Sequence, residues 1–405
     1  MPGHDRVLIA GGGPVGTITA LALARRGIPV TVFDAHAQPA EDHRASTLQP
    51  STLDLLAELG MTEEIVRRGL RSPVFQWRDQ ETNEIVAEFD FGLLADEAQH
   101  PYAIQLEQHK IIHIALDVAA RHSGFSIQRP ATVLAVSQTA DFVEVEVEHA
   151  NGSREVHRGR YLVGCDGGAS TVRKSLGVSF EGFTWPERFN IVTTTHDFER
   201  SMGFRYRNYC AHPQRWCALI KVPGEDGAGL WRCLFPAKPE ETEDEIISDA
   251  WIRARFAECL PAGAPYTLVH HNLYSVQQRV AGSFRAGRIV LAGDAAHVNN
   301  PIGGIGMNSG IHDGLNVAEK LDRIWRGADP ETLLERYDRQ RRLTAIEYVQ
   351  TQSIANKRII EERDPEARRR NLDDLRRTAA DPAAAREYVR RSSLIAMLEK
   401  AQTIQ

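Results

Sequence analysis

A glycine-rich turn near the start of the chain has the spacing that favours binding of a diphosphate. The pattern Gly11-x-Gly13-x-x-Gly16 follows a short apolar run and opens an alanine- and leucine-rich segment typical of a helix. The first glycine permits a tight turn, the second lets backbone approach a pyrophosphate, and the third lets helix and strand pack closely. The expected helix begins at Pro14 and Val15, where free N–H groups and a partial positive charge face the diphosphate.

An acidic residue completes this dinucleotide motif. Asp34 ends the next apolar run, eighteen residues after Gly16. A carboxylate at this position accepts hydrogen bonds from the ribose of an adenosine. Strand, helix and spaced acid together form a βαβ unit and predict a dinucleotide site. The motif by itself does not say which dinucleotide is bound.

Two further motifs carry a family resemblance. GCDGGASTVRKSLG (Gly164–Gly177) resembles the Asp-Gly motif of the class A, single-component FAD-dependent aromatic hydroxylases of the p-hydroxybenzoate hydroxylase type. GRIVLAGDAAHVNNPIGGIGMNSGIHDGLNVAEKL (Gly287–Leu321) resembles their Gly-Asp motif and the helix behind it. Together with the glycine turn, these motifs come in the family's order and span residues 6 to about 340. The resemblance implies that the dinucleotide is FAD.

The Gly-Asp motif also has a direct physical interpretation. The apolar run Arg288–Ala292 predicts a strand that delivers Asp294 to a loop at its carboxyl end, where open α/β sheets bind ligands. A carboxylate there can accept hydrogen bonds from ribitol, and a helix cap is the alternative role. Gly304 and Gly306 let backbone approach a flat ring. A helix from about Met307 then points its positive end at the flavin, which favours the anionic reduced form.

The resemblance assigns further cofactor contacts residue by residue. Backbone at Asn308, like that at the preceding methionine, matches positions that contact the flavin ring. Asp166 matches an aspartate implicated in holding the cofactor and in NAD(P)H use. Arg44 matches an arginine that approaches the flavin side of FAD, with a surface salt bridge as the alternative. Gln108 matches a glutamine that touches the ribitol or diphosphate, and Gln105 is an alternative register.

One loop departs from the family pattern. Where relatives often carry a histidine and two prolines, this chain has Asn299, Asn300 and Pro301. Pro301 is retained, and its neighbourhood in relatives faces substrate and flavin, so it joins the candidate catalytic residues. The two asparagines either hydrogen-bond a substituent of the substrate ring or cap the loop, and the sequence leaves both roles open.

The middle of the chain holds the candidates for contact with substrate. A base near the hydroxyl of an aromatic ring is useful, because a phenolate is more reactive than a phenol. Our preference is His212 with Tyr206, in a polar, aromatic stretch between predicted strands. The other candidates for a base are His196, Tyr209, His270 and His271, and Arg205, Arg207, Arg215 and Arg232 are candidates for meeting a carboxylate.

The predicted elements define an α/β fold with a discontinuous first domain. We expect a Rossmann-like FAD-binding domain of the GR2 type from residues 1–177 and 286–340. An inserted, mainly antiparallel β-sheet domain for substrate spans 178–285, and we expect parts of 74–105 to join that sheet. Residues 341–405 form a C-terminal helical region, whose charge-rich part after about Asp364 favours a solvated or subunit-contact surface.

Composition excludes several classes of function. The 405 residues carry a net charge of −6, which gives no basic excess for nucleic acid binding. No apolar run approaches the roughly 20 residues needed to span a membrane, and no signal peptide is expected. Five cysteines without a CxxC pair argue against disulfides and zinc. The sequence predicts a cytoplasmic, metal-free protein, with a homodimer as the default assembly.

The resemblance implies a reaction as well as a cofactor. NADH or NADPH reduces FAD, and the reduced flavin reacts with O2 to give a C4a-hydroperoxide, which hydroxylates a phenolic or hydroxylated N-heteroaromatic substrate. An epoxidase, an N-hydroxylase or a ketone oxygenase on the same scaffold is the nearest alternative. A non-catalytic binding protein is a more distant one, against which the intact loops of Asp166 and Asp294 argue.

Overall fold

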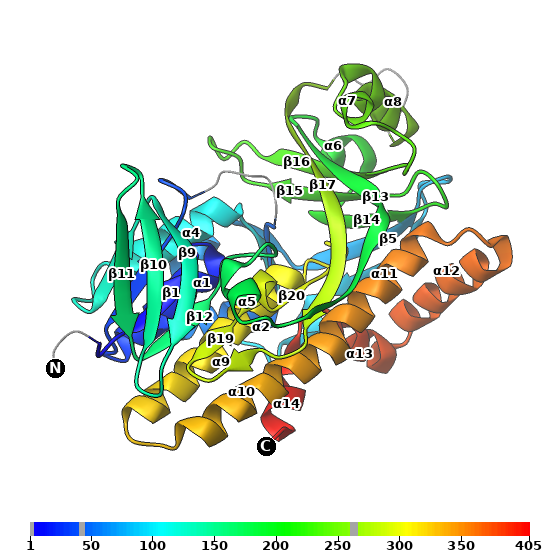
Figure 1. Cartoon of the computed structure of the whole chain (residues 1–405). Coiled ribbons are helices and arrows are strands. Elements are labelled where there is room, and N and C mark those ends of the chain that lie inside the picture. Colours follow the sequence, from blue (N-terminus) through cyan, green and yellow to red (C-terminus); the bar gives the residue numbers. More distant parts are fainter. Residues whose placement is uncertain (1–3, 40–44, 260–265) are drawn as a thin grey trace.

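The first layer of the molecule is a sheet whose strands are buried on both faces. The computed structural model describes residues 4–39, 45–259 and 266–405 (Figure 1). The strands of this sheet run parallel except for the edge pair β18–β19, and their continuous apolar runs suit burial on both faces. In spatial order they are β18 (Arg285–Ala286), β19 (Ile289–Leu291), β12 (Tyr161–Gly164), β1 (Val7–Ala10), β2 (Val30–Phe33) and β8 (Phe125–Gln128).

Helices and a smaller sheet cover these strands. Helix α1 (Pro14–Arg25) packs against both α4 (Gln108–Ala119) and α9 (Gly306–Trp325). The small antiparallel sheet consists of β9 (Ala131–Gln138), β10 (Val143–His149) and β11 (Arg154–Gly159), and it contacts β1 and β2. This is a doubly covered nucleotide-binding layer, as the βαβ pattern of the sequence predicts.

A long, mainly antiparallel sheet forms the second layer, in which the neighbours β14 and β5 run parallel. Its two longest strands, β13 (Phe180–Thr194) and β17 (Leu268–Ala281), pair along most of their length and rise from the first layer to the upper end of the molecule (Figure 1). The strand order is β20-β17-β13-β16-β15-β14-β5-β6. The remaining strands are β20 (His297–Val298), β16 (Leu230–Ala237), β15 (Cys217–Val222), β14 (Arg207–Ala211), β5 (Val74–Asp79) and β6 (Ile85–Asp90), and the short helices α6 (Phe198–Met202), α7 (Glu243–Ile246) and α8 (Asp249–Cys259) lie at the upper end.

The last part of the chain, from Pro330 onward, is helical and underlies both layers. Helix α10 (Pro330–Thr344), a π-helical turn (Ala345–Gln350) and α11 (Thr351–Glu361) follow one another along the base of the molecule (Figure 1). Three further helices complete the chain: α12 (Pro365–Ala380), α13 (Pro382–Ser392) and α14 (Ile395–Thr403). One face of α12 and α13 buries apolar side chains against β6 and a 3₁₀ turn at Phe91–Leu94, and a solvated or subunit-contact role of the opposite, charge-rich face stays a prediction.

The structure confirms the predicted fold class, with a nucleotide-binding layer, an antiparallel sheet and C-terminal helices. Strands β5 and β6 come from the first part of the chain and lie at the edge of the antiparallel sheet. None of the helices in the described ranges is both long enough and apolar enough to cross a membrane.

A buried histidine between α9 and α2 (Pro50–Glu58) should make the fold acid-sensitive. The ring of His312 lies 2.9 Å from the Thr52 hydroxyl, and burial lowers its pKa from 6.5 to about 3. Between these values the unfolded chain binds a proton that the folded chain does not, so stability is lost as pH falls below 6.5. The measurement is urea unfolding at pH 7 and pH 5. The variant His312→Gln should lose less of its free energy of unfolding on acidification, by up to about 1.4 kcal/mol per pH unit. His271→Gln, at an exposed histidine, should leave the slope unchanged.

Candidate active site

The glycine turn is shaped by close backbone contacts. A Cβ on Gly16 would lie 2.0 Å from the Gly11 carbonyl oxygen, and Gly11 itself has a φ of +100°. A Cβ on Gly13 would meet no atom within 4 Å. Helix α1 starts directly after Gly13, without a side-chain cap or an acidic residue in its first turn. The N–H groups at Val15 and Gly16 are therefore available to an anion that approaches over Gly13.

The structure brings Asp34 to this turn. Asp34 follows β2, and a Cβ on Gly12 would lie 2.5 Å from its Oδ2 atom. The carboxylate accepts a hydrogen bond from the His36 N–H at 3.2 Å and pairs with Arg129, also at 3.2 Å. Its position beside the turn is the one that a ribose-binding acid needs.

The Gly-Asp loop lies at the carboxyl end of β19. Asp294 is exposed, whereas Gly293 and Ala295 on either side of it are buried. A Cβ on Gly310 in α9 would lie 2.9 Å from the Gly293 Cα, so the helix packs directly on the loop. Because the loop is fixed from below, the Asp294 carboxylate has a defined position from which to hold a polyhydroxyl chain.

A buried ionic network fixes this loop. Asp313 in α9 accepts hydrogen bonds from the Gly293 N–H at 3.0 Å, from His297 Nε2 at 2.8 Å and from Arg341 Nε at 2.6 Å. Burial alone would raise the pKa of Asp313, but Arg341 and His297 hold it below its usual value. Arg341 comes from α10, so the network joins the Gly-Asp loop, α9 and the C-terminal helices.

The start of α9 is a second candidate anion or ring site. Gly303 and Gly304 have φ values of +114° and +61° and turn the chain into the helix. No side chain caps the first N–H groups, which include those of Gly306 and Met307. The buried side chain of Asn308 donates to the carbonyl of Gly304 at 2.8 Å, so it holds the turn and leaves the backbone N–H groups for a ligand.

The Asp-Gly loop is held by its own carboxylate. Asp166 accepts hydrogen bonds from Ser170 Oγ at 2.6 Å and from the Val172 N–H at 3.0 Å. Sequence reasoning did not single out Arg173, which donates to the carbonyls of Gly168 at 2.7 Å and Ala295 at 2.9 Å. Arg173 thereby joins the Asp-Gly loop to the Gly-Asp loop. The feature of the sequence that could have identified Arg173 is its position inside the Asp-Gly motif.

Three other predicted cofactor residues have different outcomes. Arg44 lies outside the described residues. Gln108 is the first residue of α4 and is half-buried. Gln105, the alternative register, is buried in β7 (Ala103–Gln105), where it accepts a hydrogen bond from Thr47 Oγ1 at 2.7 Å. Its Nε2 atom is buried with no hydrogen-bond partner among the described residues. The role of Gln108 in cofactor binding therefore stays a prediction. Gln105 is a further candidate, because it is a polar group close to the start of α9.

Asn300 acts as a loop cap. It is fully buried, and its N–H and Nδ2 both donate to Gln278 Oε1, at 3.1 and 3.2 Å. Its Oδ1 accepts from the Ile302 N–H, so its polar atoms are used inside the protein. Asn299 is half-buried, and Pro301 is exposed. Of these three residues, Pro301 keeps the exposure expected of a residue that faces a ligand.

The alternation of β14 separates the substrate candidates into two groups. Side chains at odd positions of a strand share one face, and those at even positions share the other. Arg207 and Tyr209 therefore point to one face of β14, whereas Tyr206 and His212 lie just before and just after the strand. The Tyr206 ring lies 5.0 Å from Lys221 Nζ. We therefore expect the two groups to do different work.

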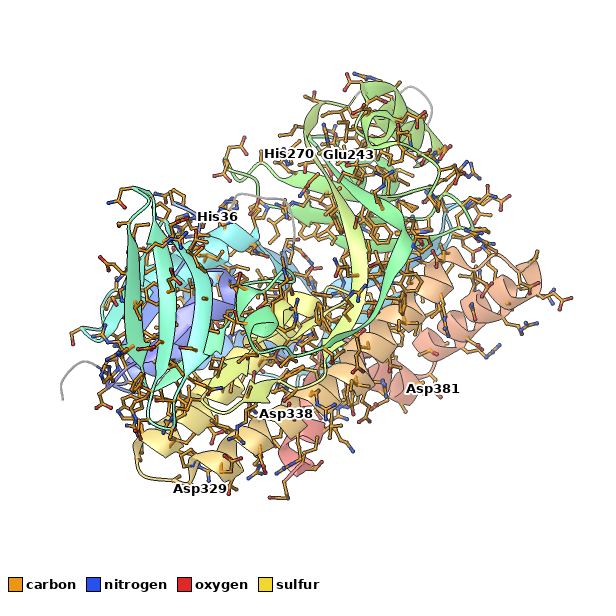
Figure 2. All side chains as sticks on the ribbon, in the orientation of Figure 1. His36, Glu243, His270, Asp329, Asp338 and Asp381 are labelled. Atoms are coloured by element: carbon orange, nitrogen blue, oxygen red, sulfur yellow. The ribbon has the colours of Figure 1, made fainter. Side chains whose placement is uncertain are left out.

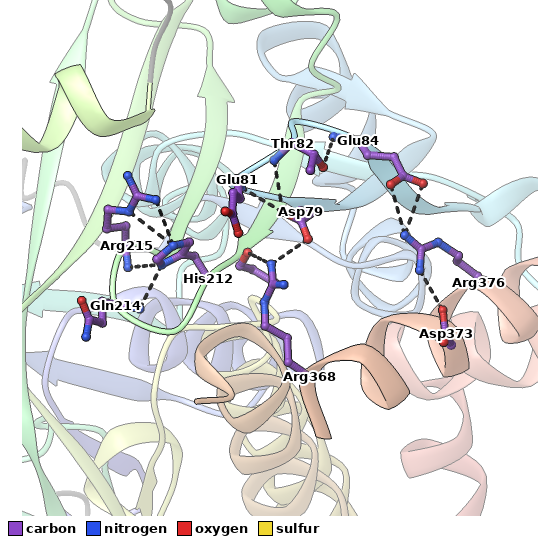
Figure 3. Close-up of polar contacts among 11 residues, drawn as sticks. Asp79, Glu81, Thr82, Glu84, His212, Gln214, Arg215, Arg368, Asp373 and Arg376 are labelled. Carbon is purple, nitrogen blue, oxygen red and sulfur yellow. Dashed lines mark hydrogen bonds and ion pairs between the residues drawn. The ribbon is translucent and has the colours of Figure 1, made fainter. Parts of the chain in front are cut away.

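His212 is occupied by the turn that follows β14 (Figure 3). Its Nδ1 accepts hydrogen bonds from the N–H groups of Gln214 and Arg215, at 3.0 and 2.9 Å. Burial and the neighbouring cations Arg215 and Arg368 lower its pKa. Among the other candidates, Arg205 pairs with Glu88, and His196 contacts Ser201. His270 and His271 are both exposed, and His270 lies near the upper end of the long sheet (Figure 2).

Arg207 is a buried cation surrounded by aromatic rings. It is 1% exposed, and its guanidinium carbon lies 4.1 Å from the centroid of Phe75 and 5.4 Å from that of Phe91. It forms no ion pair with any carboxylate of the described residues, and its Nε atom has no hydrogen-bond partner there. One contact at 3.4 Å joins Nη1 to Gln49 Oε1. Burial accordingly lowers the pKa of Arg207.

A small cavity of about 10 Å³ borders Arg207, which is room for roughly one water molecule. The Gly303 N–H contacts the hydroxyl of Tyr209, and Trp77 Nε1 donates to the hydroxyl of Tyr388 at 3.0 Å. Tyr388 lies in α13, so the C-terminal helices supply part of this wall. The lining residues are Phe75, Trp77, Arg207, Tyr209, Gly303, Ile305, Gln352, Asn356, Tyr388 and Ser392.

The site combines the Asp-Gly and Gly-Asp loops, the acid after β2 and an aromatic cavity beside the start of α9. These are the parts of a flavin-dinucleotide enzyme. The chain matches the FAD binding domain family over residues 5–352. Para-nitrophenol 4-monooxygenase of Pseudomonas sp. (strain WBC-3) is 33% identical over 393 residues, which cover 95% of this chain and 94% of that protein. 6-Hydroxy-3-succinoylpyridine 3-monooxygenase HspB of Pseudomonas putida is 32% identical over 366 residues, covering 89% and 90%.

A solved structure agrees with these relatives. The crystal structure of p-nitrophenol 4-monooxygenase PnpA from Pseudomonas putida superposes with a TM-score of 0.91 at 31% identity and covers 99% of both chains. The protein therefore belongs to the class A flavoprotein aromatic hydroxylases, which confirms the resemblance noted in its sequence motifs. The residues present fit FAD in their chemistry, because the open space over Gly13, the exposed Asp294 carboxylate and the uncapped start of α9 would offer partners to a diphosphate, a ribitol and a flavin ring.

Substitution of Gly13 by alanine should separate cofactor binding from folding. A methyl group there meets no protein atom within 4 Å, and its φ of −71° suits alanine. We expect the stability of the FAD-free protein to change by less than about 0.5 kcal/mol, while FAD affinity falls at least about tenfold. Urea unfolding and flavin fluorescence titration measure the two effects. Gly124→Ala, whose added methyl makes only ordinary contacts, is the control. Equal FAD affinity in both variants would contradict a diphosphate at Gly13.

Proposed function

We propose that the protein hydroxylates a phenolic or hydroxylated N-heteroaromatic substrate as its anion, with NADH or NADPH as reductant and O2 as co-substrate. The observation that carries the proposal is Arg207, a buried cation without a carboxylate partner among the described residues. An isolated buried charge is costly, and proteins retain such groups where a ligand compensates them. The names of the two relatives, which specify a nitrophenol and a hydroxypyridine compound, support this substrate class.

The residues that would hold the cofactor come from several elements. These are the glycine turn and the start of α1, the end of β2, the start of α4, the Asp-Gly and Gly-Asp loops, and the start of α9. Gly13, Val15 and Gly16 would bind the diphosphate, and Asp34 the adenosine ribose. The group proposed for the ribitol and ring consists of Gln108, Asp166, Asp294, Gly304, Gly306, Met307 and Asn308. When bound, FAD supplies acceptance of a hydride from NAD(P)H and transfer of one oxygen atom from O2 to an electron-rich ring.

Arg207 would hold the substrate and raise its reactivity. Its guanidinium lies among apolar rings, where low polarity strengthens attraction to an oxyanion. Stabilising the phenolate over the phenol increases electron density on the ring that accepts oxygen. Burial raises the pKa of Tyr209 even though Arg207 opposes the shift, so its hydroxyl stays protonated and can donate a hydrogen bond. Pro301 would border the same space, while Tyr206 and His212 are less favoured because they do not line the cavity beside Arg207.

The cavity must enlarge for substrate to enter. A volume of about 10 Å³ is far below that of an aromatic ring. The walls that can move without breaking the long sheet are the 301–304 turn and the side chain of Tyr388, which comes from α13. Closure of these groups around the ring would exclude water during oxygen transfer.

The test is turnover of NADH and NADPH by the FAD-loaded protein with a panel of phenols, nitrophenols and hydroxypyridines. Oxygen uptake and hydroxylated product are followed together. We expect one class of ring to stimulate oxidation strongly, with product equal to NAD(P)H consumed and with a rate that rises as the ring hydroxyl ionises. FAD retention without stimulation by any anionic ring would overturn the proposal. Light scattering on the same sample tests the further proposal of a homodimer.

A further inference from the structure

Two histidines and a glutamate converge on one face of the small three-stranded sheet, and none of them is among the residues proposed to hold the cofactor. Strand β11 pairs antiparallel with β10, in a register that places Glu155 opposite Val147 and His157 opposite Val145. Alternation along both strands puts these side chains on one face, and His149 extends the same face from the end of β10. Although the three side chains are separated in sequence, they therefore meet in space.

Their donor atoms have the separations of a metal site. The Nε2 atoms of His149 and His157 lie 3.5 and 3.4 Å from Glu155 Oε2, and all three ligand atoms lie within 4.8 Å of one another. A tetrahedral Zn²⁺ with bonds of about 2.0–2.1 Å holds its ligand atoms about 3.3–3.4 Å apart. Two of the three separations match this value without any rearrangement of the backbone.

The two imidazole nitrogens are also available to a metal ion. Both Nε2 atoms are buried, and neither has a hydrogen-bond partner among the described residues. The ring of Phe33, 4.8 Å from that of His157, holds the imidazole in place.

We propose that His149, Glu155 and His157 bind one divalent transition-metal ion, with Zn²⁺ as the best fit. Histidine nitrogens with one carboxylate suit zinc, and the fourth tetrahedral position would be taken by water, because Glu155 is on the solvent side with its side chain 59% exposed. The ion would clip the end of β10 to β11 and stabilise the sheet that packs on β2. The proposal is independent of the hydroxylation reaction and reverses the expectation of a metal-free protein, which rested on the cysteine pattern.

The experiment is calorimetric titration of Zn²⁺ into the FAD-loaded full chain after removal of metal with a chelator. We expect one Zn²⁺ per chain, a higher Tm with zinc, and with Co²⁺ in its place the visible absorption bands of a tetrahedral site. The double variant His149→Gln/His157→Gln should lose the bound ion and the rise in Tm while keeping FAD absorbance.

A matched control removes the same number of imidazoles elsewhere. His270→Gln/His271→Gln changes two exposed, neighbouring histidines of β17 and should retain the zinc stoichiometry. Glu155→Gln should weaken binding at least about tenfold and lose the tetrahedral Co²⁺ spectrum. The proposal fails if the untouched protein binds no zinc, or if the His149/His157 variant binds as much as the His270/His271 variant.

Discussion

Replacement of Arg207 by methionine should lower kcat/KM by about 100- to 1000-fold and at the same time raise the Tm of the protein. Truncating one partner of a buried, charge-assisted contact costs roughly 2–5 kcal/mol in binding or transition-state stabilisation. Without substrate, however, Arg207 has no carboxylate partner among the described residues. Methionine fills a space among Phe75, Phe91 and Tyr209 without a buried charge, so we expect a gain of about 1 kcal/mol in the free energy of unfolding.

The control for this variant is a near neighbour in the chain, in the segment just before β14. Arg205→Met removes an exposed guanidinium that pairs with Glu88 at 2.9 Å. An exposed pair is worth about 0–1 kcal/mol, so stability and kcat/KM should change little. Thermal unfolding of the FAD-loaded protein and steady-state turnover with the best anionic ring provide both readouts. A large loss of stability in Arg207→Met would show that the cation holds the aromatic cluster together, and the substrate role would then be abandoned.

The cofactor half of the site was predictable because its parts are local in sequence. Gly11 and Gly13 lie in the turn between β1 and α1, Gly16 lies in the first turn of α1, and Asp34 follows the next strand, so the motif carries its own geometry. Asp294 is equally local, since it follows a strand whose apolar run is visible in the sequence. In each case the order strand, loop, helix leaves few possible arrangements.

The substrate half was less predictable because side-chain direction and long-range packing decide it. The sequence offered Tyr206, Arg207, Tyr209 and His212 within one short stretch, and only the register of β14 shows which two face the cavity. Tyr388 reaches the same cavity from a charge-rich helix far along the chain. Its contact with Trp77 depends on how α13 docks on β6, which local periodicity does not specify.

Buried polar partners are a second kind of information that the sequence hides. Asn300 was left with two possible roles, and its three internal hydrogen-bond partners, which include Gln278 and Ser353, assign it to the loop. The metal ligands of β10 and β11 were missed for the same reason. Neither His149 nor His157 belongs to a recognised short motif, and the antiparallel register alone brings them together.

Asp313→Asn should cost about 3–5 kcal/mol of stability and weaken FAD binding. The change removes the negative charge from a site where Arg341 and His297 both contact the carboxylate, and so leaves a buried guanidinium uncompensated. The change also weakens the hydrogen bond that the Gly293 N–H donates to residue 313. Because this bond helps to fix the loop of Asp294, the loop should become less well held. Urea unfolding of the FAD-free protein and FAD titration measure the two losses, and addition of saturating FAD should recover only part of the stability.

Comparison of two arginines gives the sharper form of this prediction. Arg341 and Arg207 are both almost completely buried, but Arg341 pairs with Asp313 at 2.6 Å whereas Arg207 has no such partner among the described residues. The same substitution by methionine should therefore lower the Tm at position 341, where it strands the Asp313 carboxylate, and raise it at position 207. Combining Arg341→Met with Asp313→Leu should restore much of the loss, because neither charge is then left alone. If both arginine variants lost stability equally, burial itself and not charge compensation would govern these sites, and the assignment of Arg207 to an external anion would lose its physical basis.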